Sequence, residues 1–213
     1  MHKLTLLISA AALTLSSFGQ AKDMGSIYPI LKDFDWVAKQ QAVNQAFLGI
    51  NQAPVPLIAY GFETDKNYQF LSNKALAESK LAELHGNALA NLCNQEFVFE
   101  ELFEFGLTAS GKSFSAEMIL CENFLLAAEK RLGTKEILVA VPRRSVIYVA
   151  KKAMTTSQSN KFYYLVSYTF QDDSLANASI TNLVFGYKGS ENTSIYKVQE
   201  SELTIAAGSK TSS

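Results

Sequence analysis

The chain has 213 residues, of which 18% are charged, and its 19 Lys and Arg side chains nearly balance 20 Asp and Glu, for a formal net charge of −1 at pH 7. This balance excludes an electrostatic basis for general binding to nucleic acids or to anionic membrane surfaces. The length suits one domain with its own core, and two cysteines are too few for a disulfide scaffold.

The N-terminus has the pattern of a secretory signal peptide. His2 and Lys3 precede an apolar run over residues 4–15, and a small-residue pattern ends at Ala21. The run is shorter than the roughly 20 residues that a membrane span requires. We therefore expect cleavage between Ala21 and Lys22, which removes 21 of the 213 residues and leaves 192. The expected product is periplasmic or secreted, with no membrane anchor after cleavage.

The first half of the mature chain alternates helical and extended patterns. Residues 33–50 have apolar positions at helical spacing and predict an amphipathic helix. Residues 56–63 and 68–71 predict a strand pair around the turn at 64–67. A second helix is predicted over residues 73–93.

The middle of the chain predicts a strand followed by a central helix. Residues 97–107 alternate in character and predict one half-buried strand. Residues 115–132 are apolar on most sides and predict a third helix, which Gly133 ends.

The last third predicts a run of strands. Residues 136–141 and 145–151 are two β runs around a Pro-Arg-Arg turn, and further strands are predicted at 161–170 and 182–188. The predicted fold class is α+β, a largely antiparallel or mixed sheet with about three helices packed on it. The predicted organisation is a signal peptide (1–21), an N-terminal helical segment (22–53), a single α+β domain (54–206) and a disordered tail (207–213).

Residues 106–113, Gly-Leu-Thr-Ala-Ser-Gly-Lys-Ser, match the phosphate-binding pattern G-x-x-x-x-G-K-[ST]. In a nucleotide site the phosphate and magnesium contacts would come from Gly106, Gly111, Lys112 and Ser113. A phosphate loop follows a buried parallel strand, whereas the preceding strand here carries Glu100, Glu101 and Glu104, which would repel the ligand. We therefore favour a strand-to-helix turn with a solvated Lys112.

Few residues are candidates for catalysis. His85 is the only histidine of the expected mature chain, which excludes sites built from several histidines, and we expect no metal and no cofactor. A partly buried structural role is favoured for His85, although pairing with Cys121 is left open. For Glu100, Glu101 and Glu104 the favoured interpretation is an exposed strand face and not a catalytic carboxylate site. In an oxidising compartment we predict a disulfide between Cys93 and Cys121, the alternative being two buried small side chains.

Three segments resemble the YtpQ-like proteins, a family of unknown function. They are residues 55–65 (VPLIAYGFETD), 84–92 (LHGNALANL) and 132–144 (LGTKEILVAVPRR), and the resemblance covers roughly residues 54–188. The family pattern has an aspartate after the arginine, where this chain has Ser145. The resemblance implies a fold and transfers no catalytic residue.

The paired arginines Arg143 and Arg144 are the predicted contact with a protein partner. A rigid turn after Pro142 should project at least one guanidinium, which favours carboxylate recognition. Arg144, which matches the family pattern, is the better candidate for a structural role. The alternative for the pair is a solvated hairpin tip.

We predict an exported, soluble, non-enzymatic binding protein of the bacterial periplasm, with a protein partner and no nucleic-acid partner. Its most concrete form is an immunity-type inhibitor of a toxin aimed at the cell envelope. The alternatives are a small periplasmic hydrolase with a site around His85, Cys121 or the glutamates, and a nucleotide binder at residues 106–113.

Overall fold

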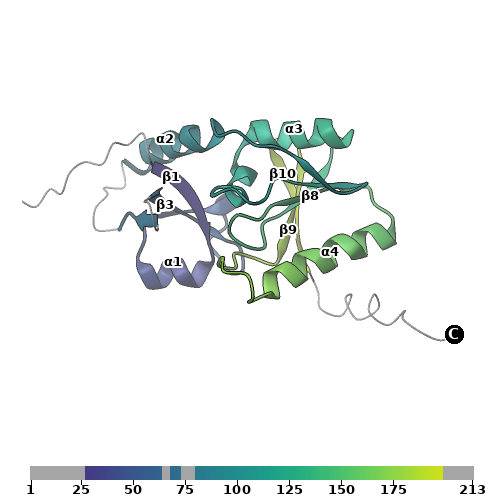
Figure 1. The fold of residues 1–213 in the computed structure, drawn as a ribbon. Coiled ribbons are helices and arrows are strands. Elements are labelled where there is room, and N and C mark those ends of the chain that lie inside the picture. The colour runs from purple at the N-terminus through teal and green to yellow at the C-terminus, as the bar shows by residue number, and fades with distance from the viewer. Residues whose placement is uncertain (1–26, 64–67, 73–79, 199–213) are drawn as a thin grey trace, which may run out of the picture.

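The computed structural model describes residues 27–63, 68–72 and 80–198, which form two antiparallel sheets and four α-helices (Figure 1). The predicted α+β class is confirmed, with four helices in place of about three. The predicted signal peptide, its cleavage site between Ala21 and Lys22, and the predicted tail 207–213 lie outside the described residues.

The first sheet has the order β1 (Ile27–Lys32), β3 (Leu57–Glu63), β2 (Asn44–Ala46), and β4 (Tyr68–Phe70) also pairs with β3. The predicted strand pair around residues 64–67 is confirmed as β3 and β4. No strand was predicted at β1, which pairs with β3 along its whole length. The N-terminal segment is therefore part of this sheet and not a separate helical extension.

The second sheet has six strands, in the order β10 (Glu191–Lys197), β9 (Leu183–Lys188), β7 (Ile137–Ala140), β8 (Tyr148–Lys151), β6 (Gly106–Thr108), β5 (Glu100–Phe103). The predicted strands that became β7, β8 and β9 are confirmed, whereas β10 was not predicted. Every residue of β7 is buried, because alternate side chains enter two different apolar clusters.

Helices cover both faces of the second sheet. Figure 1 shows α3 (Glu122–Leu132) and α4 (Thr156–Gln171) on opposite sides of it. One apolar cluster joins the first sheet, α3 and the α3-facing side of the second sheet, and α2 (Leu81–Cys93) contributes Leu84, Ala88 and Leu92 to it. A smaller cluster lies beneath α4. Of the predicted helix 73–93, the part from Leu81 onward is confirmed, and residues 73–79 lie outside the described residues.

The predicted helix at 33–50 is wrong beyond its first two turns. The helix α1 (Phe34–Gln40) begins at Asp33, whose side chain accepts from Trp36 N, and ends where Gln41 takes a left-handed conformation at φ 51°. The chain then enters β2, whose backbone groups pair with β3. The segment 33–50 therefore holds three elements, α1, β2 and the 3₁₀ helix η2 (Phe47–Gly49), and not one helix.

Two further predicted elements are broken in the structure. The predicted strand at 97–107 is a hairpin, in which β5 and β6 pair across a tight turn at Glu104 and Phe105. The predicted helix at 115–132 is a 3₁₀ helix, η5 (Ala116–Leu120), followed by α3, because Cys121 between them is extended. Gly133 ends α3 in a left-handed conformation, as predicted.

The predicted strand at 161–170 is wrong, because these residues lie within α4. Aromatic and β-branched residues in this segment favour a strand locally. A capping box at Thr155 and Gln158 starts the helix instead, and Phe162 and Val166, four residues apart, bury one face against the second sheet.

Candidate functional site

Arg143 lies on the connection between β7 and β8 and closes the C-terminal end of α4. Its Nε donates to Thr169 O at 2.7 Å, Nη1 to Asn177 O at 2.7 Å, and Nη2 to Phe170 O at 3.0 Å. Nη2 also contacts Asp173 Oδ1 at 3.1 Å. A cation at this end of a helix satisfies the last carbonyls and opposes the negative end of the helix dipole.

The expectation that Arg144 is the structural member of the pair is wrong, because Arg143 holds that role with only 4% of its surface exposed. The backbone of the connection pairs with the segment after α4, through a bridge between Arg143 and Ser179, and this turns the Arg143 side chain inward. Arg144 is half-buried, and its guanidinium carbon lies 4.1 Å from the ring centroid of Tyr68 on β4. Only Arg144 therefore remains a candidate contact residue.

Arg144 belongs to a group of ionisable side chains that we call the Lys32–Arg144 cluster, made of Lys32, Tyr68, Glu117 and Arg144. Lys32, the last residue of β1, holds its Nζ 4.6 Å from the ring centroid of Trp36. Burial lowers the pKa of Lys32, the nearby Arg144 charge lowers it further, and Glu117 opposes the change. Among the described residues, no carboxylate lies within ion-pair distance of Lys32 or Arg144.

Glu117 on η5 is the buried member of the cluster, with 1% of its surface exposed. Its Oε1 accepts a hydrogen bond from Leu31 N at 3.1 Å, which satisfies a backbone group on the outer edge of β1. Its Oε2 has no hydrogen-bond partner within the described part of the chain. Burial raises the pKa of this carboxyl to about 7, although Arg144 and Lys32 act in the opposite direction.

The raised pKa makes stability depend on pH. The folded state holds the Glu117 proton more tightly than the unfolded chain, whose carboxyl has its ordinary pKa of 4.5. The stabilising contribution of about 3 kcal/mol is therefore fully present below pH 4.5 and is lost as the pH rises through about 7. In the Glu117→Gln variant the side chain cannot ionise. It can still accept the hydrogen bond from Leu31 N, but its amide N–H group lacks a partner.

We expect Glu117→Gln to be more stable than the unmodified protein at pH 8 by about 2 kcal/mol, and no more stable at pH 5. Urea unfolding at the two pH values measures both differences. An unchanged pH dependence in the variant would contradict the assignment of this titration to Glu117.

Residues 106–113 do not have the geometry of a phosphate loop. Gly106 lies within the antiparallel strand β6. Two backbone amides that would face phosphate are already engaged, because Gly111 N donates to Ser145 O at 2.9 Å and Lys112 N donates to Ser115 Oγ at 3.1 Å. The following helix is the short 3₁₀ helix η5, which offers no N-terminal α-helical turn.

The last residue of this motif nevertheless reaches the cluster. Ser113 and Arg144 both act to lower the pKa of Tyr68, against a larger rise from burial. A pocket of about 220 Å³ lies beside Ser113, between Glu63, Phe97 and Met118. The motif at residues 106–113 and the arginine pair, which both stand out in the sequence, thus meet at Tyr68.

Sequence reasoning missed Lys32, Tyr68 and Glu117. A signal for Glu117 was present, because it is the only charged residue in the largely apolar run 114–120. The glutamates considered instead, Glu100, Glu101 and Glu104, are all exposed, in agreement with the favoured interpretation of a solvent-facing strand. No sequence pattern around Lys32 or Tyr68 indicates that either residue belongs to a site.

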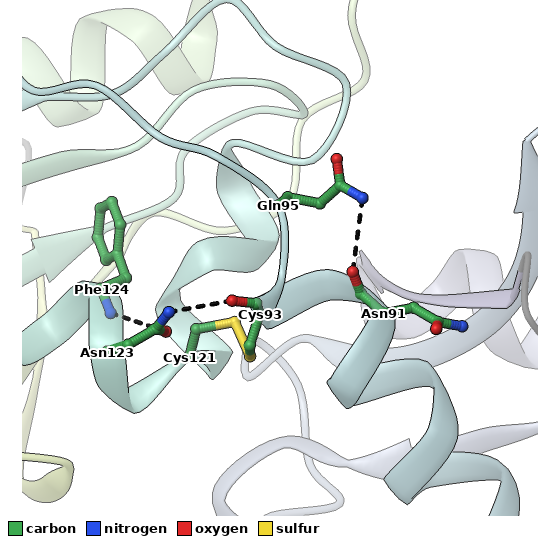
Figure 2. The surroundings of a disulfide bond; sticks show 6 residues. All are labelled: Asn91, Cys93, Gln95, Cys121, Asn123 and Phe124. Atoms are coloured by element: carbon green, nitrogen blue, oxygen red, sulfur yellow. Dashed lines mark hydrogen bonds between the residues drawn. A yellow bond between two sulfur atoms is a disulfide. The ribbon is translucent and has the colours of Figure 1, made fainter.

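The predicted disulfide between Cys93 and Cys121 is confirmed, with a Cα–Cα distance of 5.4 Å (Figure 2). It joins the end of α2 to the residue before α3. Asn123 strengthens the same junction, since its Nδ2 donates to Cys93 O at 3.0 Å and its Oδ1 accepts from Phe124 N at 3.0 Å. A nucleophilic pair of Cys121 with His85 is excluded in this oxidised form, because Cys121 has no thiol.

In ranges 27–63, 68–72 and 80–198, no three His, Cys, Asp or Glu side chains are grouped so that they could hold a metal ion. The helices in the same ranges are all too short or too polar to cross a bilayer.

Comparison of the chain with protein-family models, with curated proteins and with solved structures finds no match. The resemblance to the YtpQ-like proteins rests on its three sequence motifs alone.

Proposed function

We propose that this chain is an exported, non-enzymatic binding protein of the bacterial periplasm, whose partner is a protein with an acidic surface. Its most concrete form is an immunity-type inhibitor of a toxin directed at the cell envelope. Arg144 is the central contact residue of the proposal, and Lys32 is its neighbour in the cluster.

One observation carries the proposal. Arg144 and Lys32 are both half-buried against aromatic rings, and neither has an ion-pair partner among the described residues. A guanidinium positioned by stacking loses little further conformational freedom on binding and can bind a carboxylate through two hydrogen bonds. Arginines held in this way are enriched among the residues that dominate binding energy.

The disulfide supports the proposed compartment. Disulfides persist in oxidising environments such as the periplasm and are rare in the cytosol. Together with the signal peptide predicted from residues 1–21, the bridge favours an exported protein.

The test compares two arginine variants of the mature protein. We expect Arg144→Ala to weaken binding to a partner recovered from the periplasm by about 2 kcal/mol, or about 30-fold in Kd, because a stacked, partly desolvated contact is lost. The matched control is Arg131→Ala on α3, an arginine that is 58% exposed and bridges to the exposed Glu101. The control should bind normally, and titration calorimetry measures both affinities.

Equal affinity of a folded Arg144→Ala variant and the unmodified protein would remove the cluster from the binding surface. Failure to recover any protein partner from the periplasm would count against the binding function itself.

A further inference from the structure

The carboxyl group and the two cations of the Lys32–Arg144 cluster come together from three elements of the fold. Glu117 lies on η5, Lys32 ends β1, and Arg144 lies on the connection between β7 and β8. The contact between η5 and β1 is direct, because Glu117 Oε1 accepts a hydrogen bond from the backbone of Leu31, the residue before Lys32. Lys32 and Arg144 are half-buried and still reach the surface, whereas Glu117 is enclosed.

The surroundings of Glu117 disfavour its ionised form. Its side chain is almost completely buried, and Oε2 has no hydrogen-bond donor within the described part of the chain. A buried negative charge without a donor is costly, and protonation removes that charge. The pKa of about 7 means that the carboxyl changes between its neutral and its ionised form near neutral pH.

The protonation of Glu117 sets how strongly the cluster attracts an anion. With the carboxyl protonated, the cationic side chains of Lys32 and Arg144 have no negative group beside them to offset their charge. With the carboxyl ionised, one negative charge opposes the two cations and repels an approaching carboxylate. Water and salt screen a buried charge poorly, so this repulsion extends to the surface of the cluster.

The charges that act on the pKa of Glu117 come from Arg144 and Lys32. Asp33, the residue after β1, acts on Lys32, and Tyr68 of β4 is affected by Arg144. These two groups therefore influence Glu117 only through its cationic neighbours.

Helices α2 and α3 also pack against η5. Their nearest charged side chains along the chain, Glu83 and Glu122, are exposed to water. On α2, His85 contacts Tyr60 OH through Nδ1 at 2.9 Å, and burial lowers the pKa of this imidazole from its ordinary value of 6.5. The histidine is therefore mostly neutral at the pH at which Glu117 titrates.

We propose that the Lys32–Arg144 cluster binds the acidic group of its partner together with one proton, which Glu117 takes up. This inference rests on the proposed function, which assigns an acidic protein partner to the same cluster. A bound carboxylate stabilises the neutral form of Glu117 over the ionised form, and by linkage the neutral form binds the carboxylate more tightly. Binding is therefore strong below about pH 7 and weakens as the pH rises above it.

A tetraglutamate peptide, acetylated and amidated at its ends, is the probe, because its side chains are ionised at both pH 6 and pH 8. We expect the unmodified protein to bind it about tenfold more tightly at pH 6 than at pH 8, a typical coupling between two sites. Titration calorimetry at one ionic strength measures both affinities. Glu117→Gln stays neutral and should bind the peptide equally well at the two pH values, with the affinity of the unmodified protein at pH 6.

Two control variants address the other groups that carry or lose charge. Glu104→Gln removes an exposed carboxylate from the turn between β5 and β6 and should keep the tenfold difference. His85→Gln should keep it as well, since the histidine is not the group that takes up the proton. Thermal melts show that each variant is folded.

The link between Glu117 and Arg144 is also measurable without any ligand. Carbon-13 NMR follows the titration of the Glu117 carboxyl, whose signal is absent from Glu117→Gln. Arg144→Ala should move the midpoint of this titration to higher pH, because the guanidinium lowers the pKa of Glu117. Arg131→Ala on α3 is the matched control and should leave the midpoint unchanged.

Three results would overturn the proton coupling and leave the acidic partner in place. They are equal affinity of the unmodified protein at the two pH values, a tenfold difference that persists in Glu117→Gln, and an unchanged titration midpoint in Arg144→Ala. Absence of peptide binding at both pH values counts instead against the acidic partner, and with it against the coupling.

Discussion

Arg143→Ala is expected to lower the free energy of unfolding by about 4 kcal/mol, the largest effect of any single substitution considered. The side chain is buried, and its removal leaves the carbonyls of Thr169, Phe170 and Asn177 without their donor. The contact with Asp173 adds little, because that carboxylate is fully exposed and screened by water. The loss therefore comes from the unsatisfied carbonyls at the end of α4 and in the segment that follows it.

Urea unfolding measures this loss, with Arg131→Ala as the control, which should change stability by no more than about 0.5 kcal/mol. Arg143→Lys should recover only part of the stability, since an ammonium cannot direct donors to three separate carbonyls as the planar guanidinium does. If Arg143→Ala unfolds at the same urea concentration as the control, the guanidinium is not what holds the end of α4.

Removal of the disulfide, by Cys93→Ala with Cys121→Ala, is expected to cost about 3.5 kcal/mol. The two cysteines are 28 positions apart, and a closed loop of this size restricts the unfolded chain by roughly that amount. The bridge also joins α2, which packs on the first sheet, to α3, which covers the second. Its loss should therefore weaken the contact between the two sheets.

Dithiothreitol provides an internal control for the disulfide. The reductant should destabilise the unmodified protein to the level of the double variant and should leave the double variant unchanged. Equal unfolding midpoints for oxidised and reduced unmodified protein would show that the cross-link adds nothing to stability.

The sequence by itself determined the elements whose signals are local. The strand pair β3 and β4, the pair β7 and β8, and the end of α3 at Gly133 all follow from turn residues and alternation within a few positions. The bridge between Cys93 and Cys121 was predictable because few arrangements of two cysteines exist in an oxidising compartment. The strand pairs and the helix end depend on neighbours along the chain, whereas the bridge follows from the number of cysteines.

Only the tertiary structure decided which of two locally acceptable conformations the remaining segments adopt. The residues of α4 favour a strand by composition, yet Phe162 and Val166 bury more apolar surface as one helical face on the second sheet. Arg143 and Arg144 are adjacent and have the same side chain, so the sequence does not distinguish them. The end of α4, about 26 residues later, binds the Arg143 guanidinium and buries it, whereas Arg144 stays half-buried against Tyr68. Glu117 is buried beside β1, 86 residues earlier in the chain, whose Leu31 N donates to it, and this burial raises its pKa. In each case the deciding contact comes from a distant part of the chain, so no local pattern could report it.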